Sequence, residues 1–112
     1  MTDIEDVLEG LIQELRRGTL VLGVLSQLVA PKYGYALVQT LTEKGFAVDA
    51  GTLYPLLRRL EKQDLLISSW EIIEARPRRY YQLSEQGRTA YPRLLEQWRA
   101  MMESMNRLIE GV

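Results

Sequence analysis

The sequence contains neither cysteine nor histidine among its 112 residues. Without cysteine the chain can form no disulfide, no thiolate metal site and no thiol nucleophile. Without histidine it lacks the commonest general base and the commonest zinc ligand. A glycine-rich phosphate loop is missing too, and no pair of acidic residues stands in an apolar setting. We therefore expect neither an enzyme nor a protein with a metal or other cofactor.

Long hydrophobic runs are also missing. The longest apolar run, residues 19–30, has twelve residues and includes Ser26 and Gln27, so it is too short to span a bilayer. The N-terminal residues are acidic, unlike the basic start of a secretory signal peptide. These features predict no membrane partner and a cytoplasmic location.

What remains is an ordinary globular composition, with 46% hydrophobic and 26% charged residues, enough for one modest core. The net charge of −1 hides an uneven distribution, because residues 1–15 carry five acids and no base whereas residues 58–79 hold six bases. A molecule with one basic end can still bind phosphate groups. Its acidic remainder should lower non-specific affinity for nucleic acid.

Residues 48–61 form the most informative segment. Four leucines follow the i, i+3, i+4, i+7 spacing of an apolar helix stripe: Leu53, Leu56, Leu57 and Leu60. Other side chains fall off that stripe: Thr52, Pro55, Arg58, Arg59 and Lys62. We predict Asp49 as the N-cap with local distortion at Pro55, in preference to a start at Thr52. A helix with a buried back and a hydroxyl-and-arginine front is what insertion into a DNA major groove requires.

The segments before this helix also have helical spacing of their apolar residues. Residues 3–15 carry an apolar stripe with acids on the outer face, and residues 16–30 are apolar on most sides up to Pro31. The spacing leaves open whether these two segments form one helix or two. Residues 33–44 predict a further short helix that ends at Gly45.

Alternating apolar residues follow the 48–61 helix. Residues 65–72 and 79–83 each alternate as strands do, and residues 74–77 between them predict a turn. Helices followed by a two-stranded hairpin are the element order of a winged helix-turn-helix. The expected fold is therefore mostly α with a small two-stranded β wing.

The last segment, residues 84–112, predicts a long helix that is capped by Ser84 or Thr89 and kinked or restarted near Pro92. Its apolar residues recur in a heptad pattern that one small winged domain cannot cover, and residues 3–15 have an equally clean stripe. We therefore predict that the two terminal helices form a homodimer interface. Its predicted residues are Ile4, Leu8, Leu11, Leu94, Trp98, Met101, Met105 and Leu108.

Two interpretations are open for one aromatic and three sulfur-containing residues of this last helix: Trp98, Met101, Met102 and Met105. They offer the flat face and the adaptable side chains that an effector site for a small aromatic ligand needs. Because an aromatic residue on a heptad stripe usually packs in an interface, we favour plain dimer packing. The chain is then one domain, 1–112, made of an N-terminal helix (1–15), a winged helix-turn-helix (16–83) and a C-terminal dimerisation helix (84–112).

The chain resembles the short type of PadR-family transcriptional regulator, which has a single C-terminal dimerisation helix. The resemblance lies in the strings Gly51-Thr52-Leu53-Tyr54-Pro55 and Arg76-Pro77-Arg78-Arg79-Tyr80-Tyr81 and in segments 14–20, 33–37 and 95–99. It runs from about residue 11 to about residue 110. One departure is Ala75, where the family often has glycine.

The resemblance implies a homodimer that binds a pseudo-palindromic DNA operator, usually as a repressor. It implies that the second helix of the turn motif enters the major groove and that the wing touches the minor groove or the backbone. The resemblance also implies an effector site for this chain, since some short members of the family look built to accept flat aromatic compounds between the C-terminal helices of the dimer.

The predicted DNA contacts follow from the resemblance and the basic residues together. Thr52, Tyr54 and Arg58 are placed at or near base edges, because threonine can meet a thymine methyl or a base edge and arginine pairs with guanine. The plain alternative is a capping hydroxyl, a packing ring and a solvated cation. The full predicted set is Lys32, Tyr35, Gly51, Thr52, Tyr54, Pro55, Arg58, Arg59, Lys62, Arg76 and Arg78.

Three arginines around the predicted hairpin have different expected roles. Arg76 and Arg78 should approach the minor groove or phosphate. Arg79 shares a face with Tyr81 and Leu83, so we expect it to form an internal ion pair. A rival interpretation is a winged-helix protein-interaction module without DNA binding, which the slight excess of acidic residues favours.

Overall fold

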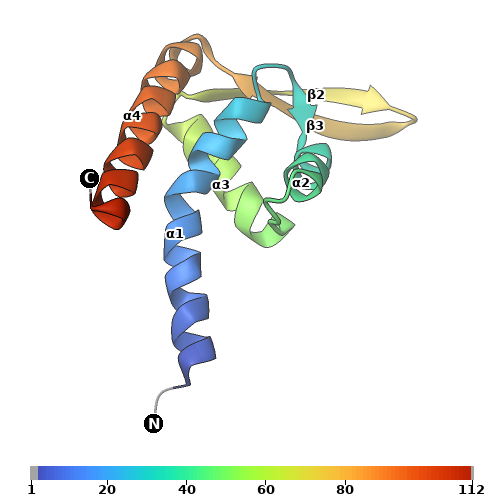
Figure 1. Cartoon of the computed structure of the whole chain (residues 1–112). Helices are drawn as coiled ribbons and strands as arrows, with labels where there is room; N and C mark the ends of the chain where they lie inside the picture. Colours follow the sequence, from blue (N-terminus) through green and yellow to red (C-terminus); the bar gives the residue numbers. More distant parts are fainter. Residues whose placement is uncertain (1–2, 112) are drawn as a thin grey trace.

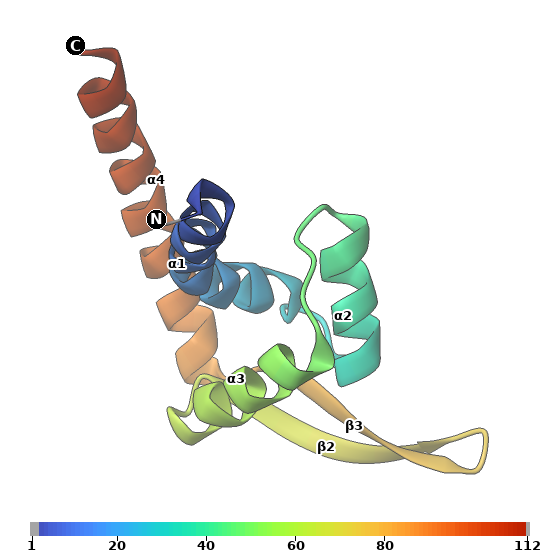
Figure 2. The same ribbon diagram turned by 90° about the horizontal axis from the view of Figure 1, so that it is seen from below.

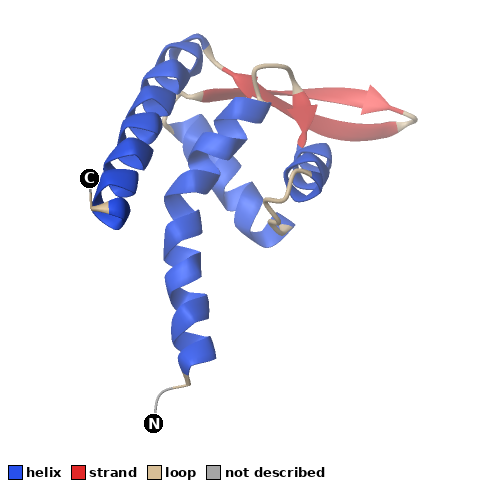
Figure 3. Ribbon diagram, in the orientation of Figure 1, coloured by secondary structure: helices blue, strands red, loops and turns tan. Residues whose placement is uncertain are grey.

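The computed structural model describes residues 3–111, which contain four helices and three strands (Figure 1). The elements are α1 (Ile4–Gln27), β1 (Lys32–Tyr33), α2 (Gly34–Glu43), α3 (Ala50–Lys62), β2 (Leu66–Ile73), β3 (Arg76–Leu83) and α4 (Glu85–Glu110). The structure is mostly helical with one small antiparallel sheet, so the predicted winged helix-turn-helix is confirmed (Figure 3). None of these helices is long and apolar enough to cross a membrane.

The core lies where α1, α2 and α3 meet the inner end of the sheet. Its centre is the predicted leucine stripe of α3, in which Leu53, Leu57 and Leu60 are at most 1% exposed. The C-terminal half of α1 and the inner face of α2 supply most of the remainder. One stripe on α3 therefore fixes which of its side chains remain outside.

Residues 3–15 and 16–30, for which the sequence left open one helix or two, contribute to the single helix α1. It runs without a break from Ile4 to Gln27, through the boundary that the sequence placed at residue 15. Gly18 in its middle weakens a helix by only about 1 kcal/mol relative to alanine, which is too little to end one whose second half is buried. The helix ends at the C-cap Leu28, ahead of Pro31.

The sheet has one strand more than the two predicted. Lys32 and Tyr33 form β1, which pairs antiparallel with β3, so the strand order is β1-β3-β2. The expected start of the helix at Tyr33 is wrong by one residue, because Tyr33 ends β1 and stands at the N-cap of α2. A strand of two residues has too little alternation to be recognised from sequence.

The tip of the wing is tighter than the four-residue turn predicted over residues 74–77. Ile73 pairs with Arg76, so only Glu74 and Ala75 form the loop, and Arg76 and Pro77 belong to β3. Both loop residues have a positive φ, 52° and 64°, as a two-residue hairpin turn of type I′ requires. Such backbone favours glycine or asparagine, and this chain has neither there.

Ser84 is the N-cap of α4, and its hydroxyl accepts the N–H of Gly87 at 2.9 Å. It is one of the two caps that the sequence predicted. A Cβ on Gly87 would stand 2.1 Å from the carbonyl oxygen of Leu65, so glycine lets α4 start against the connection between α3 and β2. The helix is uninterrupted from Glu85 to Glu110, so of the kink or restart predicted near Pro92, the restart does not occur. Val112 lies outside the described residues.

Candidate nucleic-acid interface

Helix α3 starts where the sequence predicted. The Oδ1 atom of Asp49 accepts the N–H of Thr52 at 2.7 Å and caps the first turn. Pro55 lies inside the helix and cannot donate to the carbonyl of Gly51, which is exposed and can bond to water instead. The penalty of a proline in the second turn is therefore partly offset by solvent.

The outer side of α3 carries every predicted contact of that helix except Tyr54. With four leucines turned into the core, the exposed residues are Gly51, Thr52, Pro55, Arg58, Arg59 and Lys62. Tyr54 is half-buried, because its ring packs on the bare backbone of Gly34. A Cβ on Gly34 would come within 2.5 Å of the Tyr54 Cε1 atom, so this contact sets the close approach of α2 and α3.

A hollow of about 450 Å³, here named the wing groove, lies between the start of α2, one flank of α3 and the wing. Five of the predicted contact residues line it: Tyr35, Tyr54, Arg58, Arg76 and Arg78. Trp70 on β2, which is 67% exposed, lines it too. Trp70 is not among the predicted contacts, although strand alternation places it on the same side of β2 as Leu66 and Ser68.

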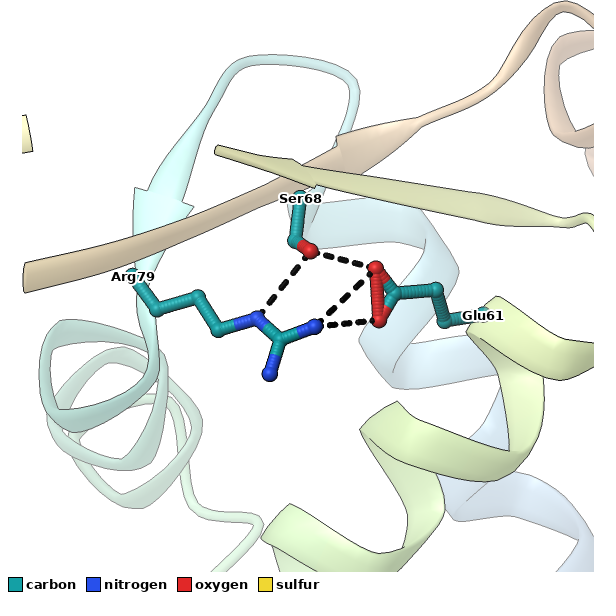
Figure 4. Close-up of polar contacts among 3 residues, drawn as sticks. All are labelled: Glu61, Ser68 and Arg79. Carbon is teal, nitrogen blue, oxygen red and sulfur yellow. Dashed lines mark hydrogen bonds and ion pairs between the residues drawn. The ribbon is translucent and has the colours of Figure 1, made fainter. Parts of the chain in front are cut away.

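Arg79, Ser68 and Glu61 form a polar cluster that ties the wing to the last turn of α3 (Figure 4). The Arg79 Nη2 atom stands 2.9 Å from the Glu61 Oε2 atom, and Arg79 Nε donates to Ser68 Oγ at 3.0 Å. The Ser68 hydroxyl in turn donates to Glu61 Oε1. The predicted internal ion pair of Arg79 is thus confirmed, and its partner is Glu61.

Aromatic rings contact two of the three arginines of β3. The Arg79 guanidinium lies 5.5 Å from the ring centre of Tyr81, and burial raises the pKa of the Tyr81 phenol while the charge of Arg79 opposes that rise. The Arg78 guanidinium lies 4.6 Å from the ring centre of Tyr33 on β1. Because Arg79 is paired with an acid, Arg78 and its neighbours carry the free positive charge of the wing groove.

The remaining predicted contacts lie elsewhere. Thr52, Pro55 and Arg59 face the opposite flank of α3, where they line a second hollow beside α1. Lys32, Gly51 and Lys62 line neither hollow. The structure therefore divides the predicted set between two flanks of one helix, which the sequence did not indicate.

The residues predicted for dimer contact and for an effector lie along the two terminal helices. Apolar side chains on the first half of α1 and the second half of α4 are exposed, among them Leu11 (52%) and Leu108 (76%). Trp98 is half-buried, and the three methionines near it are exposed. A hollow of about 550 Å³ between α1, α3 and α4 reaches Leu94 but not these four residues.

A helix-turn-helix whose second helix presents basic side chains beside an arginine-bearing wing defines the winged-helix class of transcriptional regulator. Residues 21–93 match the model of the family described as "Transcriptional regulator PadR-like family". The chain belongs to this PadR-like family, whose members are transcriptional regulators and not enzymes.

Individual relatives agree with the family model. "Transcriptional regulator Rv3488" of Mycobacterium tuberculosis is 35% identical over 101 residues, which cover 89% of this chain and 92% of the relative. The crystal structure of a PadR family transcriptional regulator from Eggerthella lenta is 43% identical, with a TM-score of 0.89 and 97% of both chains covered. A PadR-like transcription factor from Bacteroides fragilis is 34% identical, with a TM-score of 0.74 and 88% and 98% covered.

Proposed function

We propose that this protein is a homodimeric repressor that binds a pseudo-palindromic operator in double-stranded DNA. The observation that carries the proposal is the wing groove, where Arg58 of α3 faces Arg76 and Arg78 of β3. Exposed arginines on a helix suited to the major groove can read guanine, and those of a wing can hold the minor groove or phosphates. A repressor acts beside the chromosome, so we place the protein in the cytoplasm.

Dimerisation would supply the symmetry of the operator. The exposed apolar stripes of α1 and α4 are too extensive for a monomer in water, and both belong to helices that extend from the winged core (Figures 1 and 2). Pairing two copies through these stripes would cover them and hold two α3 helices at a fixed separation. Matched half-sites would then provide specificity.

An aromatic effector would act through the same stripes. Trp98 and its neighbouring methionines lie on the part of α4 that a partner would cover, so a flat ligand held there would contact both copies. A ligand that favours another dimer geometry would move the two α3 helices out of register with the operator. A ligand that binds but leaves operator affinity unchanged would exclude this regulation.

Selection of bound sequences from a random duplex pool tests the proposal. We expect a palindromic motif whose half-sites lie about one helical turn apart. Arg58→Glu and Arg76→Glu should each abolish this binding, whereas Arg107→Glu, on the last turn of α4, should leave most of it. No enrichment at low salt would contradict DNA binding and favour the protein-interaction module.

A further inference from the structure

The flank of α3 that faces α1 has a basic hollow of its own. This α1 groove, about 540 Å³ in volume, lies between the middle of α1, residues 46–49 and the exposed flank of α3. Figure 2 shows α3 between α1 on one side and the wing on the other. Three arginines line the α1 groove: Arg16, Arg17 and Arg59.

Arg16 builds this groove. Its guanidinium donates to the carbonyl of Ala47 and lies 4.7 Å from the ring centre of Phe46. It thereby attaches to α1 the segment that leads into the Asp49 cap of α3. The position of the recognition helix relative to α1 depends on this contact.

Arg17 and Arg59 leave the groove positively charged. Both are exposed, and within residues 3–111 neither side chain forms a hydrogen bond or a salt bridge. The one acid of the groove, Asp49, is engaged as the cap of α3. Arg16 and Arg17 are the only basic residues of α1, and they occur where this otherwise acidic helix passes α3.

We propose that the α1 groove holds the sugar–phosphate backbone of the DNA strand opposite to the one met by the wing, with Arg17 and Arg59 as phosphate contacts. This inference rests on the proposed function. A major groove is about 12 Å wide and a helix with its side chains is 10–12 Å across, so an inserted helix has one backbone along each flank. The wing groove serves one flank of α3, and the α1 groove serves the other.

Continuity of the surface supports this assignment. Thr52, Pro55 and Arg59 belong both to the outer side of α3 and to the lining of the α1 groove. A duplex seated on α3 therefore meets this groove without any change in the protein. Arg17 extends the contact onto α1, a helix for which the sequence predicted no DNA contact.

The test compares Arg17→Ala with Arg107→Ala, which removes the same charge from the outer end of α4. Binding of the full-length protein to the selected duplex and to a shuffled duplex is measured over a range of salt concentrations. Each lost phosphate contact lowers the magnitude of the slope of log K against log salt by about 0.9. Arg17→Ala should therefore lower this magnitude by about 2 per dimer and weaken binding to both duplexes roughly tenfold. Arg107→Ala should match the wild type.

Two further variants make the result decisive. Arg17→Lys keeps the charge and should keep the wild-type slope, and Arg17→Gln should behave like alanine while retaining most of the side-chain stem. Equal slopes for Arg17→Ala and Arg107→Ala, or a reduced slope for Arg17→Lys, would overturn this inference. Neither result would contradict the proposed binding to an operator. Failure of the wild-type protein to bind either duplex would overturn the proposed function as well.

Discussion

Two sets of apolar stripes in this molecule have the same spacing and opposite surroundings. On α3 the stripe is buried, and Leu53 and Leu57 are fully covered. On α1 and α4 the stripes are open, and Leu8, Leu11 and Leu108 are 46%, 52% and 76% exposed. Helical spacing shows which face of a helix is apolar, but it does not show whether the same chain or another covers that face.

This contrast separates two sources of stability. The α3 stripe stabilises each protomer and fixes which side of the helix is left for DNA. The open stripes can stabilise only an assembly, because apolar area gains free energy when it leaves water and these residues have not left it. Stability should therefore depend on protein concentration through α1 and α4 and not through α3.

Truncation in the buried stripe should have the largest effect. Leu57→Ala removes a fully covered side chain and leaves a cavity, so we expect the free energy of unfolding to fall by about 2–5 kcal/mol. The loss should be equal at low and high protein concentration, as measured by urea unfolding. A loss that disappears at high concentration would show that this stripe also belongs to the interface.

A charge on the open stripe should act on the assembly instead. Leu11→Glu should raise the dissociation constant of the proposed dimer about a hundredfold, or about 2.7 kcal/mol, because a carboxylate would be buried there without a partner. Gln13→Glu places the same charge on the opposite side of α1 and should have little effect on association. Sedimentation at several concentrations distinguishes them, and equal behaviour would remove this stripe from the interface.

A smaller effect is expected where the core joins the wing. Glu61→Gln breaks the ion pair with Arg79, whose side chains are 27% and 37% exposed, so unfolding should become easier by only about 1 kcal/mol. Operator binding should weaken because the angle of the wing is less fixed. Glu71→Gln removes the same charge from an exposed site on β2 and should strengthen binding slightly. Equal affinities for the two variants would contradict a positioning role for Glu61.

The smallest predicted change is a gain in stability. Ala75→Gly relieves left-handed backbone at φ 64°, which costs an alanine about 1–2 kcal/mol, while the added freedom of the unfolded chain offsets part of the benefit. The net gain should be about 0.5–1 kcal/mol, seen as a rise of a few degrees in Tm. Ala36→Gly in α2 should lower Tm, and a fall for both variants would contradict the assigned turn.

Local chemistry accounts for most of what the sequence predicted correctly. Asp49 and Ser84 could be recognised as helix caps because a short polar side chain before a periodic run satisfies free backbone N–H groups. Arg79 could be assigned to an ion pair because strand alternation turns it inward, but its partner Glu61 lies on another element. Such a pairing depends on how α3 packs against the sheet.

The features missed from the sequence are products of tertiary packing. The strand at Lys32 and Tyr33 exists because β3 offers it a free edge, and two residues alone carry no pattern. The division of the α3 contacts between two flanks depends on where α1 passes, and so does the position of Arg17. Because α1 continues through residue 15 without a break, the acidic segment with the open apolar stripe and the arginines of the α1 groove lie on one helix. The sequence left open whether these two parts form one helix or two.

The central claim is that two copies, joined through their open stripes, present two α3 helices to one duplex. Native mass spectrometry of the protein with its selected duplex tests this most directly. We expect a complex of two chains on one duplex, and no such complex for Leu11→Glu at the same concentration. A stable, sequence-specific complex that contains a single chain would contradict it.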